Sequence, residues 1–367
     1  MLIVFAILLA VHGLIHLLGT AKAFHWAELP QLTQPVSLFF GALWLIVALL
    51  FLVTAVSLFA WPRWWWVIGA CGVAVSMFVI VPSWTDAKVG ALANAIVLTG
   101  AVFGFLSQGP FSLQTEYERD VASRLSAVAA VPITDADLAH LPLPVQRYLR
   151  VAGVVGQSRV RNYRVTMHGR IRDGRESRWM PFAAEQYNFV DPPARMFYLN
   201  ASMFAVPVQG YHRYVASSAS MRVKAAALVP IVKASGMEMT QSETVTLFND
   251  MCLMAPATLI DRAIDWEAVD ALTVKARFTN AGHTIHATLV FDDAGMLTNF
   301  VSDDRYQSSI ESTSMRKLRW STPVSGTRAY GPVRVLSAGE ARWQEPGGEY
   351  AYIQLAIDDI QYNVGSR

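Results

Sequence analysis

Two histidines near the N-terminus have a spacing that could support chemistry. His12 and His16 lie in an apolar stretch, Leu2–Gly19, that contains no other His, Lys, Arg, Asp or Glu. A spacing of four residues places them on one face of a helix, where they could serve a metal ion, a quinone or a proton path. The alternative is two neutral imidazoles that are hydrogen-bonded inside a helix bundle. We favour this alternative because no other apolar stretch supplies a histidine as a further ligand.

The rest of the chain contains no recognised catalytic motif. It lacks the G-x-S-x-G nucleophile elbow, the phosphate-binding loop, the dinucleotide-binding fingerprint and H-E-x-x-H. His283 and His286 are three residues apart on a predicted strand, where they point to opposite faces and make a poor metal pair. Cys252 lies in an apolar segment and fits a small buried hydrophobic residue better than a nucleophile. We therefore expect no cofactor and no metal site in this part.

Polar and aromatic residues of the C-terminal part could line a ligand pocket. The clusters Glu185-Gln186-Tyr187 and Tyr211-His212-Arg213-Tyr214 would need hydrogen-bonding partners if they were buried. They form either a network that stabilises the fold, which we favour, or a site for the head group of a ligand. The candidate ligand-binding residues are Trp179, Glu185, Tyr187, Tyr211, His212, Met251, Met254 and Arg305.

Charged residues are distributed unevenly along the chain. Only 16% of the 367 residues are charged, 53% are hydrophobic, and the net charge is +2. A net charge so close to zero argues against a nucleic-acid-binding protein, and two cysteines cannot form a disulfide framework. Residues 113–367 have the charge of an ordinary soluble domain. The charged residues of 1–112 are Lys22, Glu28, Arg63, Asp86 and Lys88.

The N-terminal 112 residues have the pattern of a membrane domain. Four apolar stretches without Lys, Arg, Asp or Glu are each long enough to cross about 30 Å of hydrocarbon. Prolines, charged residues and tryptophans fall at their ends, as at a membrane interface. The sequence therefore predicts a four-helix transmembrane domain over residues 1–112. The four stretches are Leu2–Gly19, Val36–Ala60, Trp65–Val81 and Val89–Leu106.

The short loops between the predicted spans bear on membrane orientation. Lys22 and Lys88 fall on one side, and Arg63 falls with both ends of the bundle on the other. Because basic loops prefer the cytoplasm, this pattern favours a C-terminal domain outside the cytoplasm, whereas Arg119 and Arg124 after the fourth stretch favour the opposite orientation. Ala21-Lys22-Ala23 also resembles a signal-peptidase site, but no basic residue precedes the apolar stretch before it. We therefore interpret that stretch as a membrane span.

The remaining residues predict an α+β domain. Residues 113–157 are expected to form a helical linker, and from residue 158 apolar residues recur with the period of strands. Turn residues such as Asp173-Gly174 separate about nine or ten strands, which favours a curved antiparallel sheet or half-barrel over 158–367. Asp358-Asp359 interrupts the alternation of the last strand, which predicts a bulge there.

A segment in the middle of this domain has a different pattern. Residues 221–264 are predicted as a helical insert. Met221–Ala227 could form a strand or a helix, Leu228-Val229-Pro230 would end any helix there, and Gln241–Met254 is expected to be helical. This last helix is mostly apolar and contains several methionines, which adapt to irregular surfaces. It must bury its apolar face, and the concave side of the sheet offers the place. The helix either completes the core or caps a ligand cavity.

Short motifs recur in a fixed order along this domain, among them Trp179-Met180-Pro181-Phe182, Ser220-Met221-Arg222, Ala255-Pro256-Ala257-Thr258-Leu259 and Asp304-Arg305-Tyr306. They resemble those of an uncharacterised bacterial protein family of unknown function. The resemblance covers most of residues 140–365, and because the family has no established activity it implies no catalytic residue. More loosely, a sheet with an inserted helical segment is similar in topology to periplasmic lipoprotein carriers, which hold acyl chains in a half-closed barrel. Together with the four predicted spans, the resemblance to a bacterial family implies a multi-pass protein of the bacterial inner or plasma membrane.

Three hypotheses about function follow from these patterns. The first is a membrane-anchored domain that binds an apolar or lipid-like ligand, with the lipid bilayer as its other partner. The second is an enzyme acting on a membrane-associated substrate, which requires His212, Glu185, Asp304 and Arg305 to converge in one pocket. The third is a structural or interaction module of a membrane complex.

Overall fold

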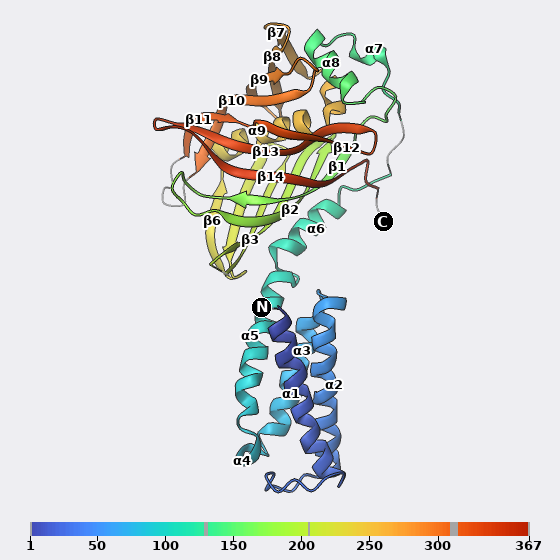
Figure 1. Cartoon of the computed structure of the whole chain (residues 1–367), viewed down its shortest axis with the longest axis vertical. Helices are drawn as coiled ribbons and strands as arrows, with labels where there is room; N and C mark the ends of the chain where they lie inside the picture. The colour runs from blue at the N-terminus through green and yellow to red at the C-terminus, as the bar shows by residue number, and fades with distance from the viewer. Residues whose placement is uncertain (1, 128–130, 205, 309–314, 366–367) are drawn as a thin grey trace. The chain divides into compact units, whose positions relative to one another are not determined.

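The computed structural model describes residues 2–127, 131–204, 206–308 and 315–365. The chain divides into two compact units, Met1–Thr115 and Glu116–Arg367, which we describe separately (Figure 1). Their border lies within helix α6, Leu113–Ala122.

The N-terminal unit is built from apolar helices. Three of them are long and apolar enough to cross a membrane: α1, α2, and the helix that begins at Gly90. The predicted third span forms α3, whose 16 residues fall short of the about 20 that a span usually needs, so four spans remain a prediction. The helices are α1 Leu2–Ala23, α2 Leu38–Ala60, α3 Trp65–Ile80, α4 Trp84–Ala87 and α5 Gly90–Gln108.

Two short helices precede the sheet of the C-terminal unit. In α7, Asp135–Leu138, the side chain of Asp137 accepts a hydrogen bond from the backbone N–H of Thr134, which caps the first turn. In α8, Leu143–Val151, the hydroxyl of the buried Tyr148 donates to the carbonyl of Cys252 at 2.8 Å. This bond ties the linker region to the interior of the unit.

The C-terminal unit is a strongly curved half-barrel in which every paired strand is antiparallel (Figure 1). Over the described residues the sheet has 14 strands in the order β6-β5-β4-β3-β2-β1-β14-β13-β11-β10-β9-β8-β7, with β12 paired to β13. The prediction of a curved antiparallel half-barrel is therefore confirmed. The strands are β1 Asn162–Ile171, β2 Met180–Val190, β3 Pro193–Met203, β4 Val206–Val215, β5 Ser218–Ala225, β6 Val229–Ser235, β7 Ile264–Ala268, β8 Thr273–Asn280, β9 His283–Phe291, β10 Leu297–Ser308, β11 Met315–Ser321, β12 Val324–Tyr330, β13 Val333–Glu345 and β14 Gly348–Tyr362.

The predicted bulge in the last strand is present. Thr166 of β1 pairs with Asp359, whereas Met167 pairs with Ile357, so Asp358 is the extra residue. A bulge increases the local twist of a sheet. It lies at the β1–β14 pairing, which joins the first strand of the sheet to the last.

The structure differs from the predicted helical insert at 221–264. Residues Ser218–Ala225 and Val229–Ser235 form the strand hairpin β5–β6, and only Met237–Met254 forms the helix α9, followed by a short 3-10 turn at Pro256–Ile260. Pro230 was interpreted as a helix terminator, but it lies in β6, the edge strand of the sheet, where a residue without an N–H is tolerated. This hairpin, together with short strands such as β7 and β12, explains why the described sheet has more than the predicted nine or ten strands.

Helix α9 lies on the concave face of the half-barrel (Figure 1). A single residue, Gly236, separates it from β6, and the φ angle of +110° at this position is accessible to glycine but rarely to other residues. Nearly all of α9 is buried on every side, including its polar residues. The helix therefore occupies the interior of the unit rather than its surface.

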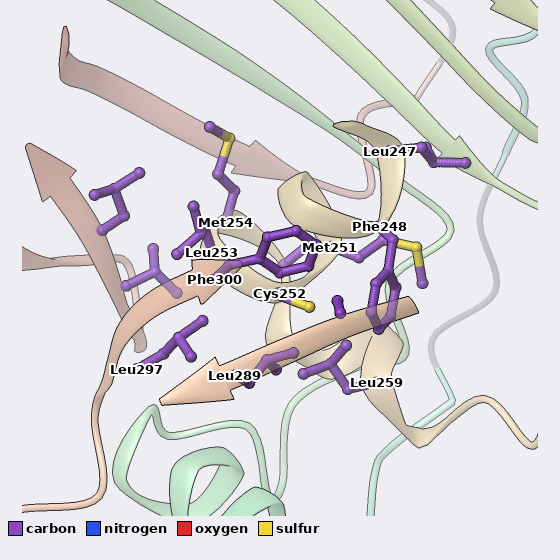
Figure 2. Close-up of a cluster of buried hydrophobic side chains, with 14 of the residues drawn as sticks. Leu247, Phe248, Met251, Cys252, Leu253, Met254, Leu259, Leu289, Leu297 and Phe300 are labelled. Atoms are coloured by element: carbon purple, nitrogen blue, oxygen red, sulfur yellow. The ribbon is translucent and has the colours of Figure 1, made fainter. Parts of the chain in front are cut away.

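One face of α9 builds the apolar core with the strands β8 to β10 (Figure 2). Phe248 is fully buried and stacks on Phe278, with ring centroids 5.0 Å apart and an interplanar angle of 11°. It also meets Phe300 edge-on at 5.9 Å. Aromatic pairs in these geometries add to the free energy gained from burial.

Replacing Phe248 by alanine should destabilise the protein by about 3–5 kcal/mol, because the surrounding rings cannot fill the cavity. Guanidinium-induced unfolding of the full chain in detergent micelles measures this loss. Leu143→Ala is the matched control, since Leu143 is 78% exposed and its truncation should change the free energy of unfolding by less than about 0.5 kcal/mol. Equal effects of the two substitutions would contradict the role given to Phe248.

Candidate functional site

The site is built where α9 faces the strands β1 to β4. Side chains alternate between the two faces of a strand, and directly paired residues share a face. Gln186, Asn188 and Arg195 contact α9 and thereby define the concave face. Their pairings place other residues of β1, β4, β5 and β14 on the same face.

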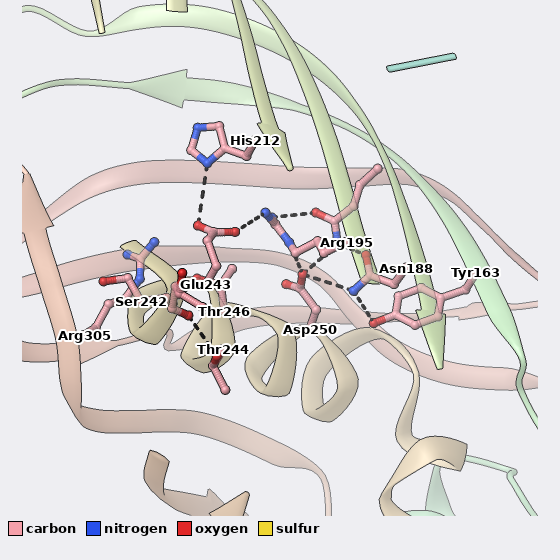
Figure 3. A network of polar contacts seen from close by, with 12 residues as sticks. Tyr163, Asn188, Arg195, His212, Ser242, Glu243, Thr244, Thr246, Asp250 and Arg305 are labelled. Atoms are coloured by element: carbon pink, nitrogen blue, oxygen red, sulfur yellow. Dashed lines mark hydrogen bonds and ion pairs between the residues drawn. The ribbon is translucent and has the colours of Figure 1, made fainter. Parts of the chain in front are cut away.

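A buried ion-pair network joins α9 to β3 (Figure 3). Arg195 of β3 donates from Nη1 to Glu243 Oε2 at 3.0 Å and from Nε to Asp250 Oδ2 at 2.7 Å. The three side chains are 6%, 1% and 4% exposed. Glu243 and Asp250 are seven residues apart, about two helical turns, so both face the same strand. One guanidinium thus holds two carboxylates of one helix.

Neutral side chains satisfy the rest of this network. Gln186 donates to Asp250 at 2.7 Å and accepts from Arg195 Nη2 at 2.8 Å. Asn188 lies within hydrogen-bonding distance of both Asp250 and the hydroxyl of Tyr163. A buried charge is costly unless its hydrogen bonds are made. Here Gln186 bonds to both Arg195 and Asp250, and Asn188 bonds to Asp250.

The two carboxylates respond differently to the same guanidinium. Burial alone would raise the pKa of Glu243, but the charge of Arg195, the nearby His212 and the charge of Arg305 outweigh burial and lower this pKa to about 2. For Asp250, burial dominates and raises the pKa above its ordinary value, although Arg195 offsets part of the rise. Glu243 is therefore firmly ionised, and Asp250 is the carboxylate that protonates more readily.

Two further cationic or titratable groups lie on the concave face beside α9. The Nδ1 atom of His212 is 3.7 Å from Glu243 Oε1. The guanidinium of Arg305 lies over the rings of Trp320, at 4.4 Å, and Trp343, at 5.2 Å, and Nη1 donates to Tyr352. Among the described residues, the buried Nε of Arg305 has no hydrogen-bond partner, and no carboxylate lies within ion-pair distance of this side chain.

Apolar side chains on this face are only half-buried. The register places Leu199 opposite Ala184, Val223 opposite Gly210, and Leu355 opposite Gly169, all on the side that faces α9. They pack against the core without being enclosed by it. This half-buried apolar surface consists of Ile171, Phe197, Leu199, Met221, Val223, Ala234, Ile353 and Leu355.

Three of the predicted ligand-binding residues lie on the opposite, convex face. Glu185, Tyr187 and Tyr211 alternate with the residues that face α9. Glu185 accepts from the hydroxyl of Tyr117 at 2.9 Å, and Tyr211 donates to Asp120 at 2.6 Å. Tyr117 and Asp120 belong to α6, so this set of residues holds that helix against the sheet.

The other predicted residues divide between core, hairpin and concave face. Met251 and Met254 are buried in the apolar core (Figure 2). Trp179 lies in the β1–β2 hairpin beneath the guanidinium groups of Arg170 and Arg172, at 4.8 and 4.5 Å. Of the residues predicted from sequence, only His212 and Arg305 therefore lie together on the concave side next to Glu243.

The constellation required for the enzyme hypothesis does not converge. His212 and Arg305 face α9, whereas Glu185 faces the convex side. Asp304 is bonded to Lys317 at 2.7 Å and to His286 at 3.1 Å, on the other side of β10 from Arg305. The four residues thus lie on two faces of the sheet.

The histidines of the N-terminal unit hydrogen-bond to neutral side chains. His12 Nε2 lies 2.9 Å from Asn94 Oδ1, and His16 Nε2 lies 2.8 Å from Ser76 Oγ. Asn94 also donates to Ser76 at 2.9 Å, which closes a network across α1, α3 and α5. Within the described residues, no group of three or more His, Cys, Asp or Glu could hold a metal ion. These partners agree with hydrogen-bonded imidazoles inside a helix bundle.

A separate recess of about 320 Å³ lies at the end of α9. It is lined by residues of the connection after α9, the β12–β13 hairpin and the end of β14, among them Pro256, Tyr330, Ile360 and Tyr362. None of the predicted ligand-binding residues lines it. The residues that contact Arg305, namely Trp320, Trp343 and Tyr352, do not line it either, so the recess is separate from the surroundings of Arg305.

Sequence reasoning missed Arg195, Glu243 and Asp250 as a functional unit. The available signal was two carboxylates seven residues apart in a predicted helix that is otherwise mostly apolar. Such a pair must find a buried cation. The sequence offers many arginines, and only the strand register identifies Arg195 as the partner.

Comparison with known proteins identifies a family without a known function. Residues 131–355 match the model of a family of unknown function, DUF6544, which confirms the resemblance predicted from the motifs. No curated protein matches the chain.

Two solved structures are loosely similar in fold. One is a putative outer membrane lipoprotein-sorting protein domain from Vibrio parahaemolyticus, with 8% identity over 56% of this chain and 86% of that chain and a TM-score of 0.34. The other is a DUF1329 family protein from Desulfovibrio piger, with 13% identity over 64% of this chain and 95% of that chain and a TM-score of 0.34. At this TM-score the likeness supports no inference about function.

The opposite pKa shifts of Glu243 and Asp250 predict opposite effects on acid stability. Because the pKa of Glu243 is lowered from 4.5 to about 2, its contribution to stability is present above pH 4.5 and is lost as the pH falls towards 2. The raised pKa of Asp250 acts in the other direction, because the folded state binds this proton more tightly than the unfolded state. Glu243→Gln should therefore weaken the rise of stability with pH, and Asp250→Asn should steepen it.

Unfolding midpoints of the full chain in detergent, measured from about pH 3 to about pH 5, test this prediction. Glu267→Gln, a substitution at an exposed position of β7, is the control and should leave the slope unchanged. Slopes that shift in the same direction in both core variants would contradict the assignment of the two carboxylates.

Proposed function

The chain belongs to the family of unknown function DUF6544, and we propose that it is a membrane-anchored binding protein for an apolar or lipid-like ligand. The N-terminal unit would supply the anchor, since three of its helices have the length and composition of membrane spans. The C-terminal unit would hold the ligand on the concave face of its half-barrel. The membrane is the bacterial inner or plasma membrane, with the C-terminal unit outside the cytoplasm.

The half-buried apolar surface is the observation that carries this proposal. Side chains such as Leu199, Val223 and Leu355 line the inside of the curved sheet without being enclosed. An apolar ligand that covers them removes this area from water, at about 25 cal/mol per Å². Helix α9 already fills the other part of the concave face, so the interior is partly a solid core and partly an open surface.

Arg305 is the proposed anchor for an anionic head group. Its guanidinium is held between aromatic rings, and its Nε has no hydrogen-bond partner within the described residues. Glu243, the nearest acidic group of α9, is already engaged by Arg195. A carboxylate or phosphate at the end of an acyl chain would complete the hydrogen bonds of Arg305 while its chain lies on the half-buried apolar surface.

The enzyme hypothesis loses its support, because its four candidate residues lie on two faces of the sheet. The polar groups that do gather on the concave face form a closed ion-pair network around Arg195. Such a network, in which each partner is satisfied, is typical of a fixed structural element. We therefore propose binding without a reaction.

Cross-linking to a fatty acid that carries a diazirine tests the proposal in the full chain, reconstituted in lipid nanodiscs. Peptides of β3, β5 and β14 should be labelled, and the variant Leu199→Lys should lower this labelling about tenfold or more, because a charge on the apolar surface is costly to bury. Asn200→Lys is the matched control: it places the same charge on the next residue, which is exposed on the convex face.

Labelling confined to the helices of the N-terminal unit would contradict the proposal. Labelling of peptides around Pro332, which lines the separate recess, would move the site to that recess. Equal labelling of the Leu199→Lys and Asn200→Lys variants would exclude the concave face.

The role of Arg305 predicts a preference between ligands of equal chain length. A fatty acid should compete with the cross-linking probe better than the corresponding fatty alcohol. Because a hydrogen bond to a charged group contributes about 1.5–3 kcal/mol, Arg305→Met should reduce this preference about tenfold or more. Arg319→Met is the control, since Arg319 pairs with Asp303 on the exposed side of β11. A preference unchanged in Arg305→Met would contradict the anchor.

A further inference from the structure

Several hairpins meet at one end of the half-barrel, and two of them end in exposed apolar residues. The β3–β4 connection contains Phe204, and the β5–β6 connection contains Leu228. The two turns are neighbours, because the backbone N–H of Ala226 donates to the carbonyl of Pro207 at 2.7 Å. Figure 1 shows both hairpins at the same end of the sheet.

The apolar residues at these turns are more exposed than the rest of their strands. Phe204 is 74% exposed, Leu228 62%, Val229 53% and Val206 40%. Single exposed apolar residues are ordinary on a protein surface, but four that lie on two adjoining turns form a patch. We call these four residues the apolar hairpin tip.

Basic side chains lie close to the apolar hairpin tip. Residues 201–235 contain no Asp or Glu, and the guanidinium of Arg178 lies 5.5 Å from the ring of Phe204. Lys224 follows on β5, close to its turn. In the part of the chain that the structure describes, neither Arg178 nor Lys224 is in an ion pair, whereas Arg222 is paired with Glu116.

We propose that the apolar hairpin tip inserts into the surface of a bilayer that contains anionic lipids. Exposed apolar and aromatic side chains next to basic residues are the combination that suits the interfacial region of such a membrane. Each basic residue near an anionic surface contributes to attraction that salt screens. If the N-terminal helices span a membrane, as proposed above, the chain itself tethers the C-terminal unit within reach of a bilayer.

Insertion at this end would deliver lipid directly to the concave face. Strands β3 and β5 end at the apolar hairpin tip, and their concave side chains, Leu199 and Val223, belong to the half-buried apolar surface. An acyl chain could then pass from the bilayer to this surface without crossing water. The inference thus rests on the proposed function for its purpose, although membrane contact itself does not require ligand binding.

Fluorescence at single labelled positions tests the insertion. The full chain with Cys71→Ser, which leaves only the buried Cys252, receives Phe204→Cys labelled with an environment-sensitive fluorophore and is reconstituted into phosphatidylcholine–phosphatidylglycerol vesicles. The label should shift its emission to shorter wavelength and be quenched several-fold by lipids that carry a nitroxide on the acyl chain. Ser217→Cys is the matched control, since Ser217 is exposed in the β4–β5 turn at the opposite end of the sheet.

The charge reversals Arg178→Glu and Lys224→Glu, combined in the labelled protein, should reduce quenching at position 204, and high salt should do the same. Equal quenching at positions 204 and 217, or no quenching at 204, would overturn the inference. Failure of fatty-acid cross-linking with quenching at 204 intact would instead reject ligand binding and leave the membrane contact standing.

Discussion

The guanidinium of Arg195 fixes the position of α9 inside the half-barrel, and the rest of the C-terminal unit depends on that position. It bonds at once to Glu243 and Asp250, which are two turns apart on the helix. One side chain of β3 therefore ties two successive turns of α9 to the sheet. Removing one partner of such a buried pair leaves an unpaired charge in the interior. The apolar contacts of Phe248 supply burial on the other face of the helix, but they are not directional.

The position of α9 divides the concave face into two parts with different properties. Towards β8–β10 the helix closes a solid core, in which Cys252 and Met254 are buried. Towards β3–β5 and β14 the apolar side chains are only half-buried, and Arg305 and His212 lie beside α9. A helix that filled the whole concavity would leave no room for a ligand, and a sheet without the helix would expose its entire interior. The proposed ligand would cover the part of the concave face that α9 leaves half-buried.

The sequence predicted those features that depend on local pattern. Apolar length located the membrane-type helices, alternation with turn residues predicted the curved sheet, and the phase break at Asp358-Asp359 predicted the bulge. Features that depend on which strands pair with one another could not be predicted from the sequence. Pro230 marks an edge strand rather than a helix end, which only the strand order reveals. Likewise, whether Glu185 or Gln186 faces the interior depends on register, since a shift of one residue reverses every side chain.

The single residue between β6 and α9 has a consequence for how the half-barrel could change its width. Gly236 makes the connection too short for the helix to move independently of the strand. Strand β6 lies at the edge of the sheet and is paired on one side, with β5. A ligand large enough to displace α9 would therefore also displace β6, so that the helix and the edge strand would move together. The size of ligand that the interior could hold therefore depends on the hydrogen-bonded pairing between β5 and β6.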